Sequence, residues 1–277
     1  MTTALVTAWL VAAAALAIQP VTDAQEQPST RVPNSPCGVR IDPVFFDSAE
    51  ASGGTVTMIA PGEPGNLDAA LAVSIDHPQT IFRFAAAEMT PGVREFRVPI
   101  DASVDSVVFF LSVQCLQTAD ITRPSGAPLA AGDGVTVSSF RAIRAAIVKR
   151  PETGVWTLRV AGTGMASVMV TARSDLALDA VQFAAAGSTD FTRQPLPGVE
   201  NAVLILLSGS TTEVKASVVD AAFRRIAPLP LTPHPSGLGY TSRFTPGAVG
   251  FRVLVEGKDA GGVPFQRVQA ALQTTVR

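Results

Sequence analysis

Alternating apolar and polar positions dominate the chain from residue 93 onward. A period of two is typical of β-strands that bury one face. In the run 106–116 both faces are apolar, with Val107 and Phe109 on one face and Phe110 on the other, so this strand is predicted to lie in the middle of a sheet. The alternation predicts strands over 94–100, 106–116, 135–148, 155–160, 166–172, 178–184, 200–208, 212–220, 250–256 and 264–272.

Two of these interpretations depend on turn residues and context. The segment 135–148 fits a helix as well as a strand, and its β surroundings favour a strand. After the strand that contains Trp156, Gly162-Thr163-Gly164 is predicted to turn the chain, so that 166–172 returns as a hairpin partner. Trp156 alternates with the apolar residues beside it and is therefore predicted to face the core.

The strands fall into two sets, each long enough for its own core. The first set closes near residue 175, which predicts an antiparallel β-sandwich over 93–175. The second set predicts another sandwich over 176–275, with a Pro- and Gly-rich connection at 227–239. Short strands separated by turns at roughly 8–12-residue intervals indicate an immunoglobulin-like sandwich for this second set.

Residues 37–90 follow a different pattern. A helix is predicted over 43–52, with Pro43 in its first turn and Gly53-Gly54 at its end. The β-branched run 55–60 predicts a strand, and 67–75 predicts a second helix. Helix, strand and helix in this order predict a short α/β piece ahead of the two sandwiches.

The first residues predict export. Ala4–Ile18 is an uninterrupted apolar run, shorter than the ~20 residues of a membrane span and typical of a signal-peptide core. Small residues favour cleavage after Ala24, which gives a signal helix over 1–24 and a polar, Pro-rich linker over 25–36. The first three residues carry no Lys or Arg, so a short buried helix or an uncleaved anchor is the alternative. The predicted location is secreted, periplasmic or at the cell surface, with no membrane span in the mature chain.

The chain has two cysteines, Cys37 and Cys115. An oxidising compartment permits them to pair, and the bridge would close a long loop. The alternative is two separate buried thiols, because the sequence does not give the distance between them.

Composition and motifs argue against catalysis. The formal net charge is −2, which leaves no basic surface for nucleic acid. The two histidines, His77 and His234, stand beside prolines in predicted loops, and no G-x-S-x-G motif is present. Cysteines and histidines are too few and too far apart for a zinc site. We therefore predict no enzyme activity, no catalytic residues, no cofactor and no metal site.

Two motifs in the predicted sandwiches resemble a known family. The first is Pro151-Glu152-x-Gly154-x-Trp156, and the second is Phe265-Gln266-Arg267-Val268 at the start of the last predicted strand, near the end of the second module. Their order and spacing are similar to those of hemicentin-type, von Willebrand factor A domain-containing proteins. The resemblance runs from about 37 to 273, and it names Pro151, Gly154, Trp156, Phe265 and Arg267 as structural motif residues.

The resemblance implies a mainly β protein of three parts. It implies the end of a von Willebrand A-like domain over 37–90, a galactose-binding-like sandwich over 93–175 and an immunoglobulin-like sandwich over 176–275. The family's metal-dependent adhesion motif, Asp-x-Ser-x-Ser, has its nearest counterpart at 101–105, where Asp105 replaces the last Ser and the segment lies in the wrong module. Metal-dependent adhesion is therefore not implied.

These observations lead to three hypotheses. The first is an exported, non-enzymatic binding or scaffold protein that meets a protein or glycan partner at the cell surface. The second is a lectin-like module that binds carbohydrate at the loop end of 93–175, and a glycan array distinguishes it from the first. The third is a truncated adhesion protein that lacks its metal-dependent adhesion site, and the DNA upstream of Met1 tests it.

Overall fold

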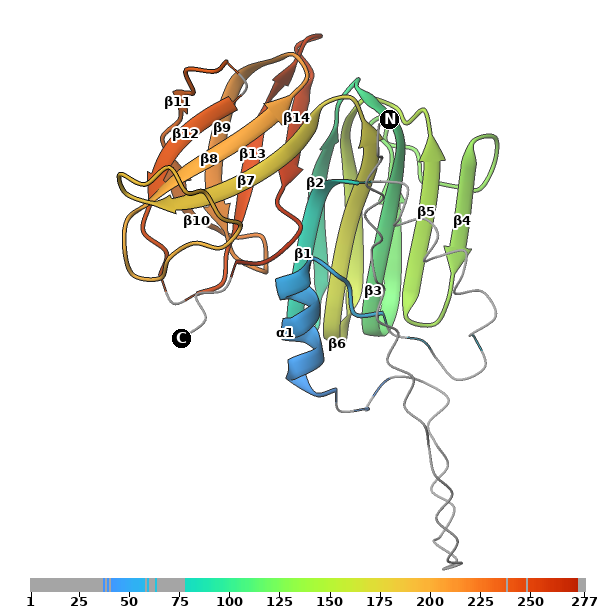
Figure 1. The fold of residues 1–277 in the computed structure, drawn as a ribbon. Coiled ribbons are helices and arrows are strands. Elements are labelled where there is room, and N and C mark those ends of the chain that lie inside the picture. The colour runs from blue at the N-terminus through green and yellow to red at the C-terminus, as the bar shows by residue number, and fades with distance from the viewer. Residues whose placement is uncertain are drawn as a thin grey trace, which may run out of the picture. The chain divides into compact units, whose positions relative to one another are not determined.

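The computed structural model describes residues 37, 39, 41–57, 59, 63, 78–237, 239–247 and 249–273, all within one compact unit that spans 33–277. The fold is mainly β, as predicted (Figure 1). Its elements are α1 (Pro43–Ser52), β1 (Gln79–Met89), β2 (Val93–Ile100), β3 (Val104–Thr122), β4 (Val135–Ser139), β5 (Ile143–Lys149), β6 (Gly154–Ser174), β7 (Ala177–Ala185), β8 (Asn201–Ser208), β9 (Thr211–Val219), β10 (Arg225–Leu229), β11 (Thr232–Pro233), β12 (Gly239–Phe244), β13 (Arg252–Asp259) and β14 (Pro264–Val268).

The first module, β1 to β6, is a single antiparallel sheet that folds back on itself. The strand order is β1-β6-β3-β5-β4, and β2 also pairs with β6. The Phe109 ring lies 5.0 Å from the Trp156 ring, although the residue of β6 that pairs with Phe109 is Val170. Trp156 and Val170 would be about 45 Å apart on a straight strand. The two halves of β6 therefore face each other across the core, which makes the folded sheet a sandwich.

The fold-back occurs at glycines that the sequence predicted to form a hairpin turn. That prediction is wrong, because β6 runs without interruption from Gly154 to Ser174 and stays paired with β3 on both sides of the bend. The β3–β6 register shifts on either side of Cys115. A Cβ on Gly162 would lie 2.5 Å from the Cys115 carbonyl oxygen, and Gly164 has φ +83°. Glycine here permits close strand contact and a bulge. In the sequence, glycines that serve these purposes cannot be distinguished from glycines in a hairpin turn.

The core of the first module confirms the predicted alternation. Trp156, Val107 and Phe109 are each 0% exposed and belong to one apolar cluster. Phe110 on the opposite face is also buried, as predicted for a strand covered on both sides. The ambiguous segment 135–148 forms the hairpin of β4 and β5, which confirms its interpretation as strand.

The second module, β7 to β14, is a sandwich of two four-stranded sheets. Their orders are β10-β9-β13-β14 and β11-β12-β8-β7. If β7 to β14 are lettered A, B, C, C′, D, E, F and G in chain order, these sheets correspond to the C′CFG and ABED sheets of the immunoglobulin fold, as predicted. Phe183 and Phe251 pack edge to face between the two sheets. The predicted connection at 227–239 instead contains part of β10, β11 and the start of β12.

The segment ahead of the first module agrees with the prediction only in part. Helix α1 has the predicted bounds, with Asp42 as its N-cap and the left-handed Gly53 as its C-cap. The predicted strand at 55–60 is not formed at the described residues 55–57 and 59. The predicted helix at 67–75, the signal helix at 1–24 and the linker at 25–36 lie outside the described residues.

Strand β1 changes the predicted start of the first module. It pairs antiparallel with β6 along most of its length, so the folded sheet begins at Gln79, whereas the sequence placed its start at 93. Its apolar side chains enter the same core as those of β2, where Phe84 and Phe96 lie 4.9 Å apart. Helix α1 packs on the other face of β1 and β6 through Phe46, Ala85 and Met165. This helix and the sheet beneath it form one side of the site described next.

Candidate binding site between the two sandwiches

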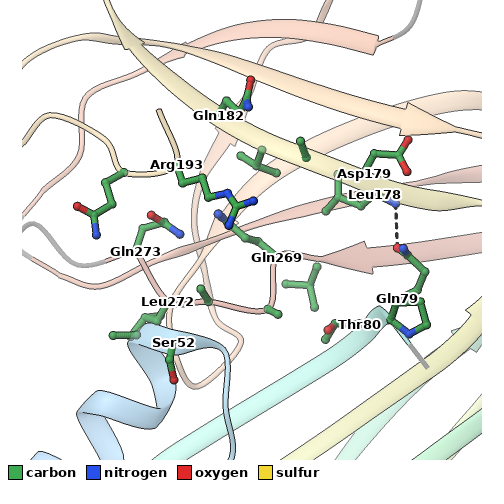
Figure 2. A pocket seen from close by; sticks show the side chains of 18 residues that line it. Ser52, Gln79, Thr80, Leu178, Asp179, Gln182, Arg193, Gln269, Leu272 and Gln273 are labelled. Carbon is green, nitrogen blue, oxygen red and sulfur yellow. Dashed lines mark hydrogen bonds between the residues drawn. The ribbon is translucent and has the colours of Figure 1, made fainter. Parts of the chain in front are cut away.

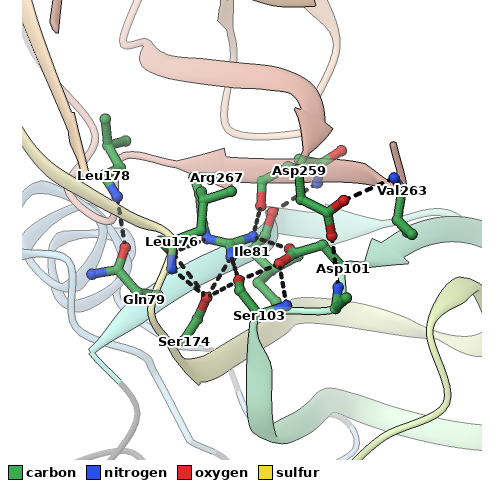
Figure 3. A network of polar contacts seen from close by, with 12 residues as sticks. Gln79, Ile81, Asp101, Ser103, Ser174, Leu176, Leu178, Asp259, Val263 and Arg267 are labelled. Atoms are coloured by element: carbon green, nitrogen blue, oxygen red, sulfur yellow. Dashed lines mark hydrogen bonds and ion pairs between the residues drawn. The ribbon is translucent and has the colours of Figure 1, made fainter. Parts of the chain in front are cut away.

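A buried ion pair joins the two sandwiches (Figure 3). Arg267 of β14 and Asp101, which follows β2, have 0% exposed side chains, and the Arg267 Nη1 donates to the Asp101 Oδ2 at 2.7 Å. The guanidinium also donates to the Leu176 carbonyl oxygen at 3.0 Å and to the Ser174 hydroxyl at 2.7 Å. Because each charged group has several partners, the cost of removing the pair from water is offset by hydrogen bonds.

A second contact, from the second sandwich, holds the turn between β2 and β3 that contains Asp101. Asp259, at the end of β13, accepts the Ala102 backbone N–H at 3.0 Å through Oδ2. Its other carboxylate oxygen accepts the N–H groups of Gly261 and Val263, which orders its own turn. The turn between β2 and β3 is therefore fixed by two acids, one from each sandwich.

A second ionic cluster lies under helix α1. The Glu50 carboxylate on α1 pairs with Arg83 of β1, at 2.7 Å, and with Arg252 of β13. Arg83 also donates to the carbonyl oxygens of Gly53 and Gly54 just after the helix. All three charged side chains are at most 3% exposed. One carboxylate thus directly contacts two guanidiniums, so these contacts include one more cation than anions.

Burial has the largest effect on the pKa of Arg252. Burial lowers the pKa of Arg252 to about 10. The Arg83 charge adds to this shift, whereas the Glu50 and Asp220 carboxylates oppose it. Two guanidinium nitrogens, Arg83 Nε and Arg252 Nη1, are buried and have no hydrogen-bond partner. This cluster is therefore less well compensated than the pair of Arg267 and Asp101.

A pocket of about 490 Å³ opens beside these two clusters (Figure 2). Its walls come from the end of α1, the start of β1, strand β7, the loop after β7 and the segment after β14. The polar and charged side chains that line it are Ser52, Gln79, Thr80, Asp179, Gln182, Arg193, Gln194, Gln269 and Gln273. Gln79 closes one end by accepting the Leu178 N–H at 2.9 Å.

The clusters underlie the pocket directly. The Ala270 carbonyl in the pocket wall accepts the Arg252 Nε at 3.1 Å, and the Leu272 N–H donates to the Glu50 backbone carbonyl at 2.8 Å. Gln266 of β14 donates to the Ile81 carbonyl of β1 at 2.7 Å. The walls of the pocket are thus held by hydrogen bonds that cross between the two sandwiches, so the pocket is preformed.

The residues of the first sequence motif contribute to the packing of the first module. Trp156 is fully buried, as predicted, and donates its indole N–H to the Glu152 carbonyl at 2.9 Å. Pro151 is buried just before β6. Gly154 has φ +128°, and a Cβ there would lie 2.9 Å from the Pro124 Cβ. The structure brings none of these three to the pocket.

The second motif reaches the junction. Phe265 is 1% exposed in the core of the second sandwich, while Arg267 binds Asp101. The sequence places Asp101 in a non-matching adhesion motif and does not identify Arg267 as its partner. A usable signal was present, because a charged residue within an apolar strand is rarely buried without a counter-charge. Arg83, Arg252 and Arg267 all stand in such strands.

The two cysteines lie side by side at the bend of the first module. Their Cα atoms are 5.0 Å apart, within the range that a disulfide requires. Cys115 follows the register shift of β3, and Cys37 lies a few residues before α1. A bridge here would attach the segment that leads into α1 to the folded sheet.

The other candidates for chemistry show no assembled site. His77 lies outside the described residues. The His234 Nδ1 shares a hydrogen bond with the nearby Ser236 hydroxyl in a turn. In the part of the chain that the structure describes, no three His, Cys, Asp or Glu side chains are grouped as metal ligands. No helix among the described residues is long and apolar enough to span a membrane.

Comparison with known proteins agrees with the resemblance. Residues 82–175 match the family model of the hemicentin galactose-binding domain-like region, to which they are similar. The chain is 27% identical over 190 residues to hemicentin-1 of Homo sapiens and 26% identical over 190 residues to hemicentin-1 of Mus musculus. Each alignment covers 64% of this chain and 3% of the relative, so the chain spans a small part of these proteins.

Among solved structures, a lipase from Bacillus licheniformis, BlEst2 in its propeptide form, is similar with a TM-score of 0.35 and 16% identity. The similarity covers 68% of this chain and 40% of the lipase. A value this low carries no argument about fold or activity.

Proposed function

We propose that the chain is an exported, non-enzymatic binding or scaffold protein that acts in extracellular or cell-surface interaction. The observation that carries this proposal is the rigid junction of the two sandwiches, with Arg267 and Asp101 fully buried between them. A junction closed by buried ion pairs holds the surfaces of the two sandwiches in a fixed relation. This property suits a scaffold.

Three further observations support the proposal. The similarity of residues 82–175 to the hemicentin galactose-binding domain-like family supports an extracellular binding role. The apolar run Ala4–Ile18 has the length of a signal-peptide core. Cys37 and Cys115 are positioned to form a disulfide, which is expected to persist in an oxidising compartment.

Expression of the full chain in a secreting host tests the proposal. We expect the protein outside the cytoplasm, shortened at its N-terminus near Ala24 and without free thiols. The purified protein should bind a cell-surface or matrix preparation in a saturable manner and should not turn over ester, peptide or glycoside substrates. A protein that stays in the cytoplasm with two free thiols would contradict the proposal.

The other two hypotheses have different standing. The pocket offers a place for a glycan, which favours the carbohydrate-binding alternative, although at a different position from the predicted loop end of 93–175. That a von Willebrand A-like domain ends within 37–90 stays a prediction, and the DNA upstream of Met1 still tests it.

A further inference from the structure

The pocket between the sandwiches contains hydrogen-bonding groups that the fold does not use. Gln273 is 6% exposed and Thr80 is 8% exposed, and both line the pocket. Neither side chain bonds to any other described residue, and the same holds for Gln182 on the facing strand β7. The polar atoms of these three side chains are not fully buried, so they are accessible and free to bond a ligand. These three groups therefore favour a polar ligand.

The charge in the pocket specifies that ligand further. Arg193 is the only cation among the lining residues, and Figure 2 shows its guanidinium pointing toward Gln269. It forms no ion pair with any described residue. The only lining acid, Asp179, already accepts the Ser208 hydroxyl at 3.4 Å. The pocket therefore offers one unpaired guanidinium, which suits one carboxylate.

The arrangement of these groups favours a sugar over a peptide. An extended peptide satisfies its amides along one strand edge. Here the available groups come from separate segments: Thr80 from β1, Gln182 from β7, Arg193 from a loop, and Gln269 and Gln273 from the segment after β14. Side-chain amides both donate and accept, as the hydroxyls around a sugar ring do. A volume of about 490 Å³ accommodates one or two sugar rings.

We propose that this pocket binds a carboxylate-bearing sugar, such as the uronic acid residue of an acidic glycan, with Arg193 on the carboxylate and the surrounding amides on the hydroxyls. This inference rests on the proposed function, because it names the ligand class of an extracellular binding protein. The evidence for a sugar is the chemistry of the pocket alone, because the description 'galactose-binding domain-like' names a fold and does not show that a sugar is bound.

Calorimetry on the purified, exported protein tests the inference. The probes are glucuronate- and galacturonate-containing disaccharides, the same sugars as methyl esters, and an acidic peptide of equal charge. We expect saturable binding of a uronate disaccharide, at least tenfold weaker binding of its ester, and a decrease in affinity with added salt. Arg193→Gln should weaken uronate binding at least tenfold, and Arg193→Lys should retain part of the affinity.

Arg173→Gln is the matched control, since Arg173 is an exposed arginine on β6 that does not line the pocket. It should bind the uronate as the unsubstituted chain does. The inference is wrong if no uronate binds at millimolar concentration, if acid and ester bind equally, if the peptide binds better, or if Arg193→Gln and Arg173→Gln behave alike. In each of these cases, an exported protein that still binds cell surfaces would leave the proposed function intact.

Discussion

The two ionic clusters between the sandwiches differ in how fully their buried charges are paired and hydrogen-bonded. Around Arg267, one guanidinium meets one carboxylate, and hydroxyl and carbonyl groups take up the remaining hydrogen bonds. Around Glu50, one carboxylate meets two guanidiniums, and two of their nitrogens have no partner. The first cluster is a balanced pair and the second carries a surplus cation. We expect the balanced pair to be the more sensitive to the loss of one member, because nothing nearby replaces it.

Asp101→Ala should give the largest effect. It leaves the Arg267 guanidinium buried without a counter-charge, and breaking a buried pair in this way costs about 3–5 kcal/mol. The free energy of unfolding from urea titration is the measurement. Asp101→Ala combined with Arg267→Met should recover much of the loss, because no unpaired charge is then buried. Equal losses in the single and double variants would contradict an ion pair with this role.

Removal of the disulfide should rank second. If Cys37 and Cys115 pair as their positions suggest, Cys37→Ser should destabilise the protein by about 2–4 kcal/mol. Because the bridge holds the segment that leads into α1, amide exchange should increase around Glu50 more than around Asp101. The reducing agent dithiothreitol should reproduce this effect in the unsubstituted chain. Free thiols in the untreated protein would show that the two cysteines do not pair.

Arg252→Met should cost less, up to about 2 kcal/mol, because it removes the surplus cation and leaves Glu50 paired with Arg83. Methionine keeps part of the volume of the arginine stem. Urea titration beside Asp101→Ala gives the comparison directly. A loss as large as that of Asp101→Ala would mean that both guanidiniums are needed to hold the Glu50 carboxylate.

The exposed ion pair of Lys258 and Glu213 should give the smallest effect on stability. Lys258 lowers the pKa of Glu213 by a hydrogen bond and by its charge. A carboxyl whose pKa is lowered on folding contributes stability above its unfolded pKa and loses it as the pH falls through the folded pKa. Glu213 is solvent-exposed, so Glu213→Gln should leave the melting temperature at pH 7 unchanged within error, and the two proteins should also agree at pH 3. A clear decrease in the melting temperature of Glu213→Gln at pH 7 would show that solvent exposure does not explain why this pair contributes less stability than the buried clusters.

The sequence predicted features that depend on local patterns. Alternation located most strands, and the environment of Trp156 followed from its own strand. The bend at Gly162 could not be distinguished from a hairpin, because glycine serves both. The pocket could not be predicted, since Thr80 and Arg193 belong to different sandwiches and come together only when the two sandwiches pack. Pairing of Arg267 with Asp101 depends on the same packing.

The bend of β3 and β6 has a consequence for mechanical load. Both strands run through the two layers of the first module, so the layers are joined by continuous backbone as well as by side-chain packing. Under tension, such layers cannot slide past each other without breaking the strand pairing on both sides of the bend. Resistance to shear in this module is thus a property of chain path, and it should survive surface substitutions that leave the glycines of the bend in place.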